Sequence, residues 1–177
     1  TELVRSFDRS GHTQAVAAGI YRDDAVSFPD GVDFYPVYYT APGTECVDGD
    51  IPFPILGMSD SMPYPSTLYS DLNSDMAKLL KQRFLSVLHE AVRDLDPDLI
   101  VCHHLYLLTA MVRNEFRDRR VYGICHGSDL RQFENCSFET EYIRAMIDGL
   151  DGIFALHSAQ KTMISKLFRI PAERVDI

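Results

Sequence analysis

The chain has 177 residues, of which 46% are hydrophobic and 24% are charged, and its formal net charge is −9. This composition is typical of one globular domain and excludes an intrinsically disordered chain. The acidic balance argues against non-specific nucleic-acid binding, which needs clustered lysine and arginine, so we expect no nucleic-acid partner.

The first part of the chain predicts a helix, two strands and a long irregular segment. Apolar residues in 2–9 stand at helical spacing, and Gly11 follows as a helix-end glycine. The runs 13–20 and 32–39 are typical of strands. Segment 40–73 contains five of the nine prolines, which lack an amide hydrogen and disrupt regular elements. It is either an insertion on the surface or a loop beside a substrate cleft.

From residue 73 onward, helices and strands alternate. Asn73, Ser74 and Asp75 supply capping residues for an amphipathic helix that carries an apolar stripe from Met76 to Leu95. Strands are then predicted at 99–102, 121–125 and 152–156, and helices at 105–116, 137–150 (capped by Ser137) and 159–168. Continuous apolar strands that alternate with helices indicate an α/β fold. We therefore expect one Rossmann-like domain over 1–177, with a parallel sheet covered by helices on both faces.

One basic cluster stands out in this acidic chain. Its two interpretations are a solvated helix end, where cations suit the helix dipole, and a contact with an anionic substrate or a membrane surface. The cluster consists of Arg113, Arg117, Arg119 and Arg120.

The four cysteines show no C-x-x-C spacing, and two of them close apolar runs, as small buried residues do. A reduced, cytosolic setting is the simpler interpretation. No run reaches the roughly 18 consecutive apolar residues of a membrane span. The cysteines are Cys46, Cys102, Cys125 and Cys136, of which Cys102 and Cys125 close the runs.

Histidines follow three consecutive predicted strands, and four of the six histidines stand there. His103 and His104 come after the strand at 99–102, His126 after 121–125, and His157 after 152–156. Ligands of open parallel sheets bind beyond the carboxyl ends of the strands, and imidazole can donate, accept and titrate near neutrality. Taken singly, each histidine could be a hydrogen-bonded loop or core residue. As a set, they predict a common site at one sheet edge.

Other residues in these turns fit the same site. Gly127 permits close approach of a ligand to the backbone, and Asp129 can hold a sugar hydroxyl or a cation. The histidine spacing carries no metal-binding signature, so we expect no metal. The sequence also lacks the glycine-rich motifs G-x-G-x-x-G and G-x-x-x-x-G-K-[ST].

The run from His126 to Gln132 (HGSDLRQ) resembles the N-terminal domain of family-four retaining glycosyltransferases of the GT-B fold. Three further segments are similar to that family: Ser10 to His12, Pro97 to His104, and Ile170 to Val175 (IPAERV). Each motif is short, but their order and spacing agree over most of the chain.

The resemblance implies transfer of a sugar, of the hexosyltransferase type, from a nucleotide-diphosphate donor with retention of configuration, without metal or other cofactor. It implies that His126 faces the donor sugar as the catalytic residue and that loops of this domain choose a carbohydrate, lipid-linked or small-molecule acceptor. From the cysteine pattern we expect a cytoplasmic protein, and peripheral membrane contact is compatible with that location. The residues expected to bind substrate are His103, His104, Gly127, Ser128, Asp129, Arg131, His157 and Ser158.

In that family a first strand with a glycine-rich loop precedes this region, and a donor-binding C-terminal domain follows it. We therefore expect this chain to be the acceptor-side half of an enzyme and to be inactive alone. The alternatives are a non-catalytic nucleotide-binding module of flavodoxin-like or Rossmann-like fold, and an interaction module that kept the fold without the chemistry.

Overall fold

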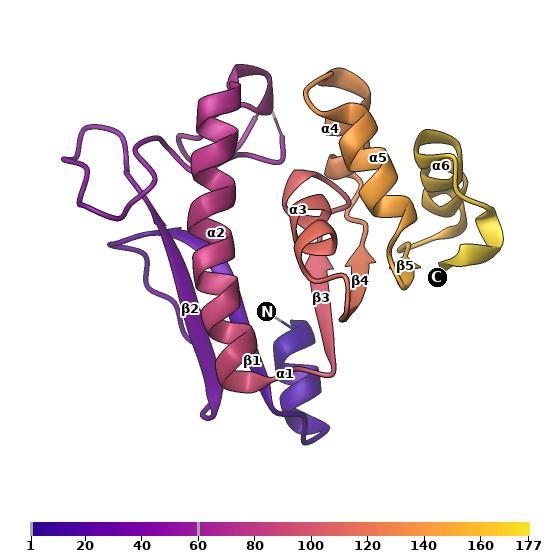
Figure 1. Ribbon diagram of the computed structural model, residues 1–177, viewed down its shortest axis with the longest axis horizontal. Coiled ribbons are helices and arrows are strands. Elements are labelled where there is room, and N and C mark those ends of the chain that lie inside the picture. Colours follow the sequence, from indigo (N-terminus) through magenta and orange to yellow (C-terminus); the bar gives the residue numbers. More distant parts are fainter. Residues whose placement is uncertain (1, 60) are drawn as a thin grey trace. The chain divides into compact units, whose positions relative to one another are not determined.

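The computed structural model describes residues 2–59 and 61–177 and divides them into two compact units. The N-terminal unit comprises the described parts of Thr1–Ile55, Tyr64–Thr67 and Asn73–Pro97. The C-terminal unit comprises the described parts of Leu56–Pro63, Leu68–Leu72 and Asp98–Ile177. Both contain parallel strands flanked by helices, which confirms the predicted Rossmann-like α/β class (Figure 1).

The N-terminal unit consists of helix α1 (Glu2–Arg9), strands β1 (Gln14–Tyr21) and β2 (Val32–Tyr39), and helix α2 (Ser74–Leu95). The two strands are parallel over their full length, with Gly19 opposite Val37. Of the three predicted capping residues, Asn73 caps α2, because its side-chain oxygen accepts from the amides of Asp75 and Met76, both at 3.0 Å. Phe84 of α2 contacts Tyr39 edge-on and helps form the small core of this unit.

The segment after β2 folds back onto the end of that strand. Ile51 forms a parallel bridge with Tyr39 and is fully buried, and the Asp50 side chain beside it is also buried. Further along, the segment contains a short 3-10 helix, Tyr69–Asp71, which belongs to the C-terminal unit. The irregular character predicted for residues 40–73 is therefore confirmed, apart from this helical turn.

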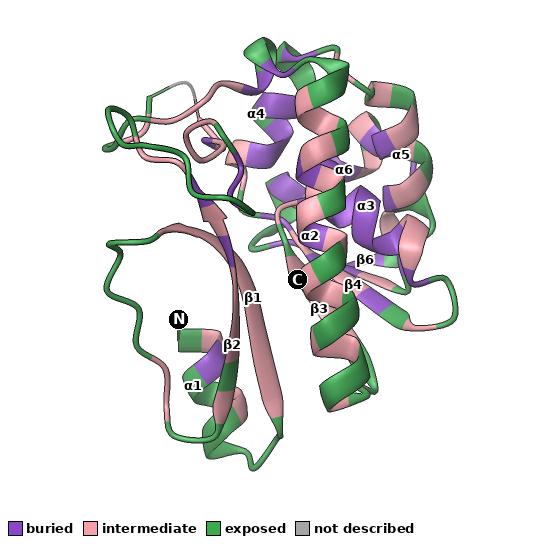
Figure 2. Cartoon of the chain, turned by 60° about the vertical axis from the view of Figure 1, so that its left-hand side comes forward, coloured by how far each residue is buried: buried purple, intermediate pink, exposed green. Residues whose placement is uncertain are grey.

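The C-terminal unit contains four parallel strands in sequential order: β3 (Leu99–His103), β4 (Arg120–Ile124), β5 (Gly152–Phe154) and β6 (Val175–Asp176). Its helices are α3 (Leu107–Glu115), α4 (Ser128–Asn135), α5 (Thr140–Asp148), α6 (Ser158–Phe168) and the 3-10 turn Ala172–Arg174. Helix α5 packs against α3 and α6, and the buried side chains concentrate in this unit (Figure 2). The centre of the core includes Val121, Ile143, Ile147, Ile153, Ile164, Phe168 and Val175.

The predicted strands are all present, but they hydrogen-bond in two sheets and not in one. Within the described residues, β1 pairs with β2, and β3 begins a separate four-stranded sheet. The register between strands far apart in sequence is decided by tertiary packing, so the apolar runs alone could not assign each strand to a sheet.

The helix predicted over 137–150 is present as α5, which is shorter at both ends. A further helix, α4, precedes α5 and begins directly after Gly127, where no helix is predicted from the sequence. Ser137 does not cap α5. The capping position of α5 is Glu139, whose side chain makes no capping hydrogen bond. No helix is predicted over 128–135, although Leu130 and Phe133 of α4 are buried at helical spacing.

One member of the basic cluster, Arg113, does not belong to a solvated helix end. Arg113 is only 9% exposed and donates to the carboxylate of Asp151 at 2.9 Å and to the carbonyl of Arg119 at 3.1 Å. The same Asp151 oxygen accepts from the amide of Val121 at 2.8 Å. Arg113 thus joins α3 to the start of β4 and to the turn before β5. A surface contact with an anion is therefore open only to the other arginines of the cluster.

We expect the substitution Gly123→Ala to destabilise the C-terminal unit by about 1–3 kcal/mol, because a methyl group in a filled core forces its neighbours to shift. A β-carbon at Gly123 would lie 2.5 Å from Leu105 Cδ2 and 2.9 Å from Leu150 Cδ1, and both leucines are buried. Chemical denaturation followed by circular dichroism measures the effect.

The double variant Gly123→Ala/Leu105→Ala is the matched control, since removal of the Leu105 side chain opens space for the new methyl group. Its loss of stability should be smaller than the sum of the two single losses. Additive losses would show that residue 123 does not contact Leu105.

Candidate functional site

The carboxyl ends of β3, β4 and β5 lie side by side in the four-stranded sheet. His103 pairs with Ile124 across β3 and β4, and the amide of His104 donates to the carbonyl of Ile124 at 2.9 Å. The amide of Cys125 donates to the carbonyl of Phe154 at 2.9 Å, which fixes the end of β4 beside β5. The three histidine-bearing segments are therefore neighbours, and they form the edge where parallel sheets bind ligands.

Three imidazoles meet at this edge. His103 Nδ1 and His126 Nε2 are 2.9 Å apart and share a hydrogen bond, and the His104 ring centroid lies 4.6 Å from that of His126. Part of His103 and part of His126 are open to solvent, whereas His104 is more deeply buried. Because the shared bond has room for one proton, both rings cannot be protonated while it persists. This pair therefore carries at most one positive charge.

His104 has an unusual backbone conformation and an unpaired side-chain atom. His104 adopts a left-handed conformation with φ 68°, which is uncommon for a residue with a side chain. Its carbonyl accepts from the amide of Tyr106 at 2.9 Å and from the hydroxyl of the buried Thr109. Its Nδ1 atom is buried without a hydrogen-bond partner among the described residues. Strained, incompletely bonded polar groups of this kind cluster at functional sites.

Asp129, on the first turn of α4, is completely buried. Its carboxylate accepts from the amide of Leu105 at 2.7 Å, from the amide of His126 at 3.2 Å and 3.3 Å, and from the amide of Leu130 at 3.2 Å. The Cys125 thiol also donates to it at 3.4 Å, and burial raises the pKa of that thiol, which keeps it protonated. Asp129 thus ties the segment after β3 to the segment after β4, in a position no ligand reaches directly.

Gly127 provides the turn from β4 into α4. Its φ of 87° lies in the region that favours glycine, and a β-carbon there would lie 3.4 Å from Gln160 Nε2. Ser128 is the first residue of α4, and Arg131 lies one turn further on with an exposed side chain. These two predicted substrate-binding residues therefore lie on the helix that starts at the histidine cluster.

His157 and Ser158 lie at the neighbouring strand end, but His157 is held differently from the other histidines. It caps α6, because its Nδ1 accepts from the amide of Gln160 at 3.2 Å. The buried Gln160 side chain in turn accepts from the amide of Leu156 at 2.6 Å. The structure thus brings His103, His104 and His126 together, and gives His157 a capping role at the next turn.

Sequence reasoning missed Gln160, which lies between the turns after β4 and β5. A glutamine three residues after a capping residue is a known helix-start pattern, and that pattern at His157 was the signal that could have found it.

The local environment disfavours protonation of two of the three clustered histidines. Burial lowers the pKa of His103, and the neighbouring His126 lowers it further. Burial also lowers the pKa of His104; the carboxylate of Asp129 opposes that effect. Neutral imidazoles at this edge can donate and accept hydrogen bonds to hydroxyl groups.

No metal-binding arrangement of three or more His, Cys, Asp or Glu side chains occurs in the parts of the chain that the structure describes. Over the same residues, no helix has the length and apolarity to cross a membrane. No known protein-family model matches the chain, and no curated protein matches it significantly.

We expect Asp129→Asn to lower the free energy of unfolding by about 1–3 kcal/mol. The side-chain nitrogen of the new asparagine would replace an oxygen that accepts hydrogen bonds, so buried backbone amides would lose their acceptor. The NMR signals of His104 and His126 should shift with it, since Asp129 fixes both segments. Denaturation and imidazole NMR spectra provide the two measurements.

The matched control is Asp98→Asn. Asp98 is exposed, and its side chain makes no hydrogen bond within residues 2–59 and 61–177. This substitution should change stability by less than about 0.5 kcal/mol. An Asp129→Asn variant as stable as this control would contradict the positioning role.

We expect His126→Gln to raise the pKa of His103 toward its ordinary value, because it removes the imidazole whose charge opposes protonation of His103. Burial remains, so the recovery should be partial. A pH titration of the imidazole signals by NMR measures the change. His157→Gln is the control and should leave the pKa of His103 unchanged, whereas no rise in the His126→Gln variant would rule out coupling between the two rings.

Proposed function

We propose that this chain is the acceptor-side half of a retaining glycosyltransferase that uses a nucleotide-diphosphate sugar. The observation that carries the proposal is the pair of hydrogen-bonded imidazoles, His103 and His126, held at the carboxyl edge of a parallel sheet. Polar groups at that edge meet ligands in open α/β folds. The sequence resemblance at His126 to Gln132 supplies the reaction class.

His126 is the residue we assign to the reacting sugar. It is exposed, its Nε2 bonds to His103, and its backbone amide is fixed by Asp129. With Nε2 engaged, Nδ1 is the atom that can meet a sugar hydroxyl or charge developing at the reacting centre. Such a contact accelerates the reaction only where it strengthens in the transition state.

The other residues have supporting roles in this proposal. Gly127 lets the sugar approach the backbone, and Ser128, Arg131, His157 and Ser158 lie on neighbouring turns where they can contact the substrates. Asp129 acts as a positioning residue, because its carboxylate is buried and occupied by backbone amides. The acceptor is a carbohydrate, a lipid-linked molecule or a small molecule, and a further domain holds the nucleotide.

In the full-length protein, we expect His126→Ala to reduce kcat/KM for sugar transfer by about 100-fold or more, as a positioned polar or acid–base group supplies that much. The measurement offers a panel of nucleotide-diphosphate sugars and acceptors and detects products by mass spectrometry. The thermal melt should change little, because the His126 side chain is exposed.

Glu134→Ala, an exposed change on the same helix α4, is the matched control and should retain activity. Normal turnover by His126→Ala would show that the imidazole is not part of the reaction. Tight binding of a nucleotide by residues 1–177 alone would instead favour the alternative nucleotide-binding module.

A further inference from the structure

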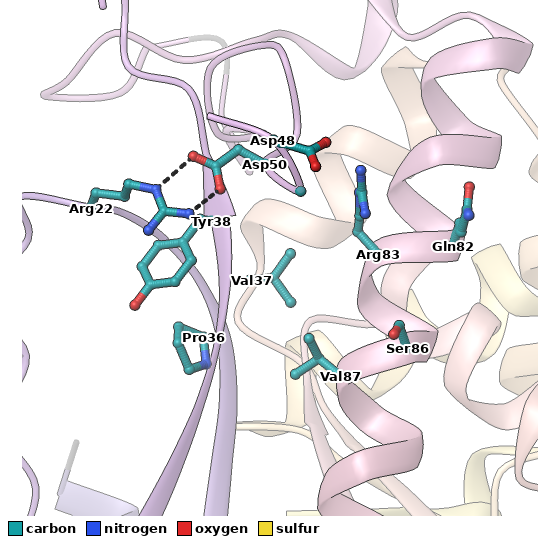
Figure 3. A pocket seen from close by; sticks show the side chains of 11 residues that line it. Arg22, Pro36, Val37, Tyr38, Asp48, Asp50, Gln82, Arg83, Ser86 and Val87 are labelled. Carbon is teal, nitrogen blue, oxygen red and sulfur yellow. Dashed lines mark hydrogen bonds and ion pairs between the residues drawn. The ribbon is translucent and has the colours of Figure 1, made fainter. Parts of the chain in front are cut away.

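A second polar site lies entirely within the N-terminal unit, in a pocket of about 240 Å³. Strand β2 and residues 48–50 form one side of it, and one face of helix α2 forms the other (Figure 3). Drug-sized ligands occupy cavities of about 300–1,000 Å³, so this pocket suits a smaller molecule.

One of the two arginines that line the pocket, Arg22, is paired with an aspartate of the protein. Arg22 donates to both carboxylate oxygens of Asp50, at 2.8 Å and 2.7 Å, and its guanidinium lies 4.3 Å from the centre of the Tyr38 ring. Asp50 is only 6% exposed. The two charges therefore compensate each other, and this pair forms a fixed wall of the pocket.

Arg83 on helix α2 is arranged differently. Its Nε atom is buried, yet it finds no hydrogen-bond partner in the described parts of the chain, and no ion pair engages its guanidinium there. Apart from Asp50, the one acidic residue among those that line the pocket is Asp48, which is exposed. A buried N–H without a partner is costly, and a planar guanidinium matches the oxygens of a carboxylate or phosphate.

The rest of the α2 face adds hydroxyl-binding and apolar groups. Gln82 and Ser86 line the pocket on either side of Arg83, and Val87 faces Val37 across it (Figure 3). An amide and a hydroxyl can each both donate and accept, which suits the hydroxyl groups of a polyol, and the valines suit its C–H surface.

We propose that this pocket binds a small polyhydroxylated anion, a sugar phosphate or a sugar acid. Arg83 holds the phosphate or carboxylate, and Gln82 and Ser86 hold the hydroxyl groups. The inference rests on the geometry of the N-terminal unit and stands whether or not the histidine site transfers sugars.

The test is isothermal titration of the full chain with glucose 6-phosphate, glucuronate, glucose and inorganic phosphate. Either of the first two should bind at least 10-fold more tightly than glucose and than inorganic phosphate, because each of the latter offers only half of the recognised chemistry. Preference for glucose 6-phosphate over glucuronate would identify phosphate as the anion, and the reverse would identify carboxylate. Failure of both to bind at millimolar concentrations would overturn the proposal.

Arg83→Gln should weaken binding of the preferred anion by about 10-fold or more, since it removes a charge-assisted hydrogen bond. Arg93→Gln removes one positive charge from the exposed face of the same helix and should leave affinity unchanged. Asp48→Asn should bind as tightly as the original chain or more tightly. Equal affinity in the Arg83 and Arg93 variants would show that the anion binds elsewhere.

Ser86→Trp provides a second test of the pocket that does not depend on whether the Arg83 variant folds. Ser86 is exposed, so a large side chain there should fill the pocket without disturbing the core. Binding should be abolished while the thermal melt is retained. Retained binding in a folded Ser86→Trp variant would exclude this pocket as the site.

Discussion

The arrangement of the histidine cluster depends on one buried carboxylate. Asp129 is taken out of water completely, and its charge is compensated by backbone amides from Leu105, His126 and Leu130. Burial of a carboxylate is unfavourable unless such donors surround it. Because the donors come from the segments after β3 and β4, satisfying this one group fixes both strand ends. The positions of His104 and His126, and the start of α4, follow from that requirement.

The cluster is built for hydrogen bonding and not for a permanent cation. The bond between His103 and His126 holds a single proton, and burial lowers the pKa of His103 and of His104. A neutral imidazole beside a buried negative charge can exchange donor and acceptor roles without bringing a second charge into the site. This property suits recognition of sugar hydroxyls, and it explains why the proposed chemistry is assigned to the exposed His126 and not to Asp129.

Two arginines, one in each unit, link distant segments of the chain, whereas Arg83 does not. Arg113 and Arg22 are both paired with aspartates, and each joins separate stretches of chain: α3 to the turn before β5 in one unit, and the end of β1 to the segment after β2 in the other. Arg83 has a buried Nε atom but makes no such bond among the described residues. Since buried polar groups are normally satisfied within the protein, the contrast points to a partner from outside the chain.

The sequence by itself determined the features that depend on neighbours within a few residues. The Asn73 cap, the apolar stripe of α2, the buried strands and the histidines after them all express local periodicity or local hydrogen bonding. Tertiary structure decided which strands share a sheet, that Arg113 is buried, and that the buried Asp129 holds the segments after β3 and β4 together. The carboxylate of Asp129 could equally have faced a ligand, because its partner Leu105 lies 24 residues away and nothing local indicates that they meet. Contacts between distant segments form only when the core packs, and the pattern of single residues does not encode them.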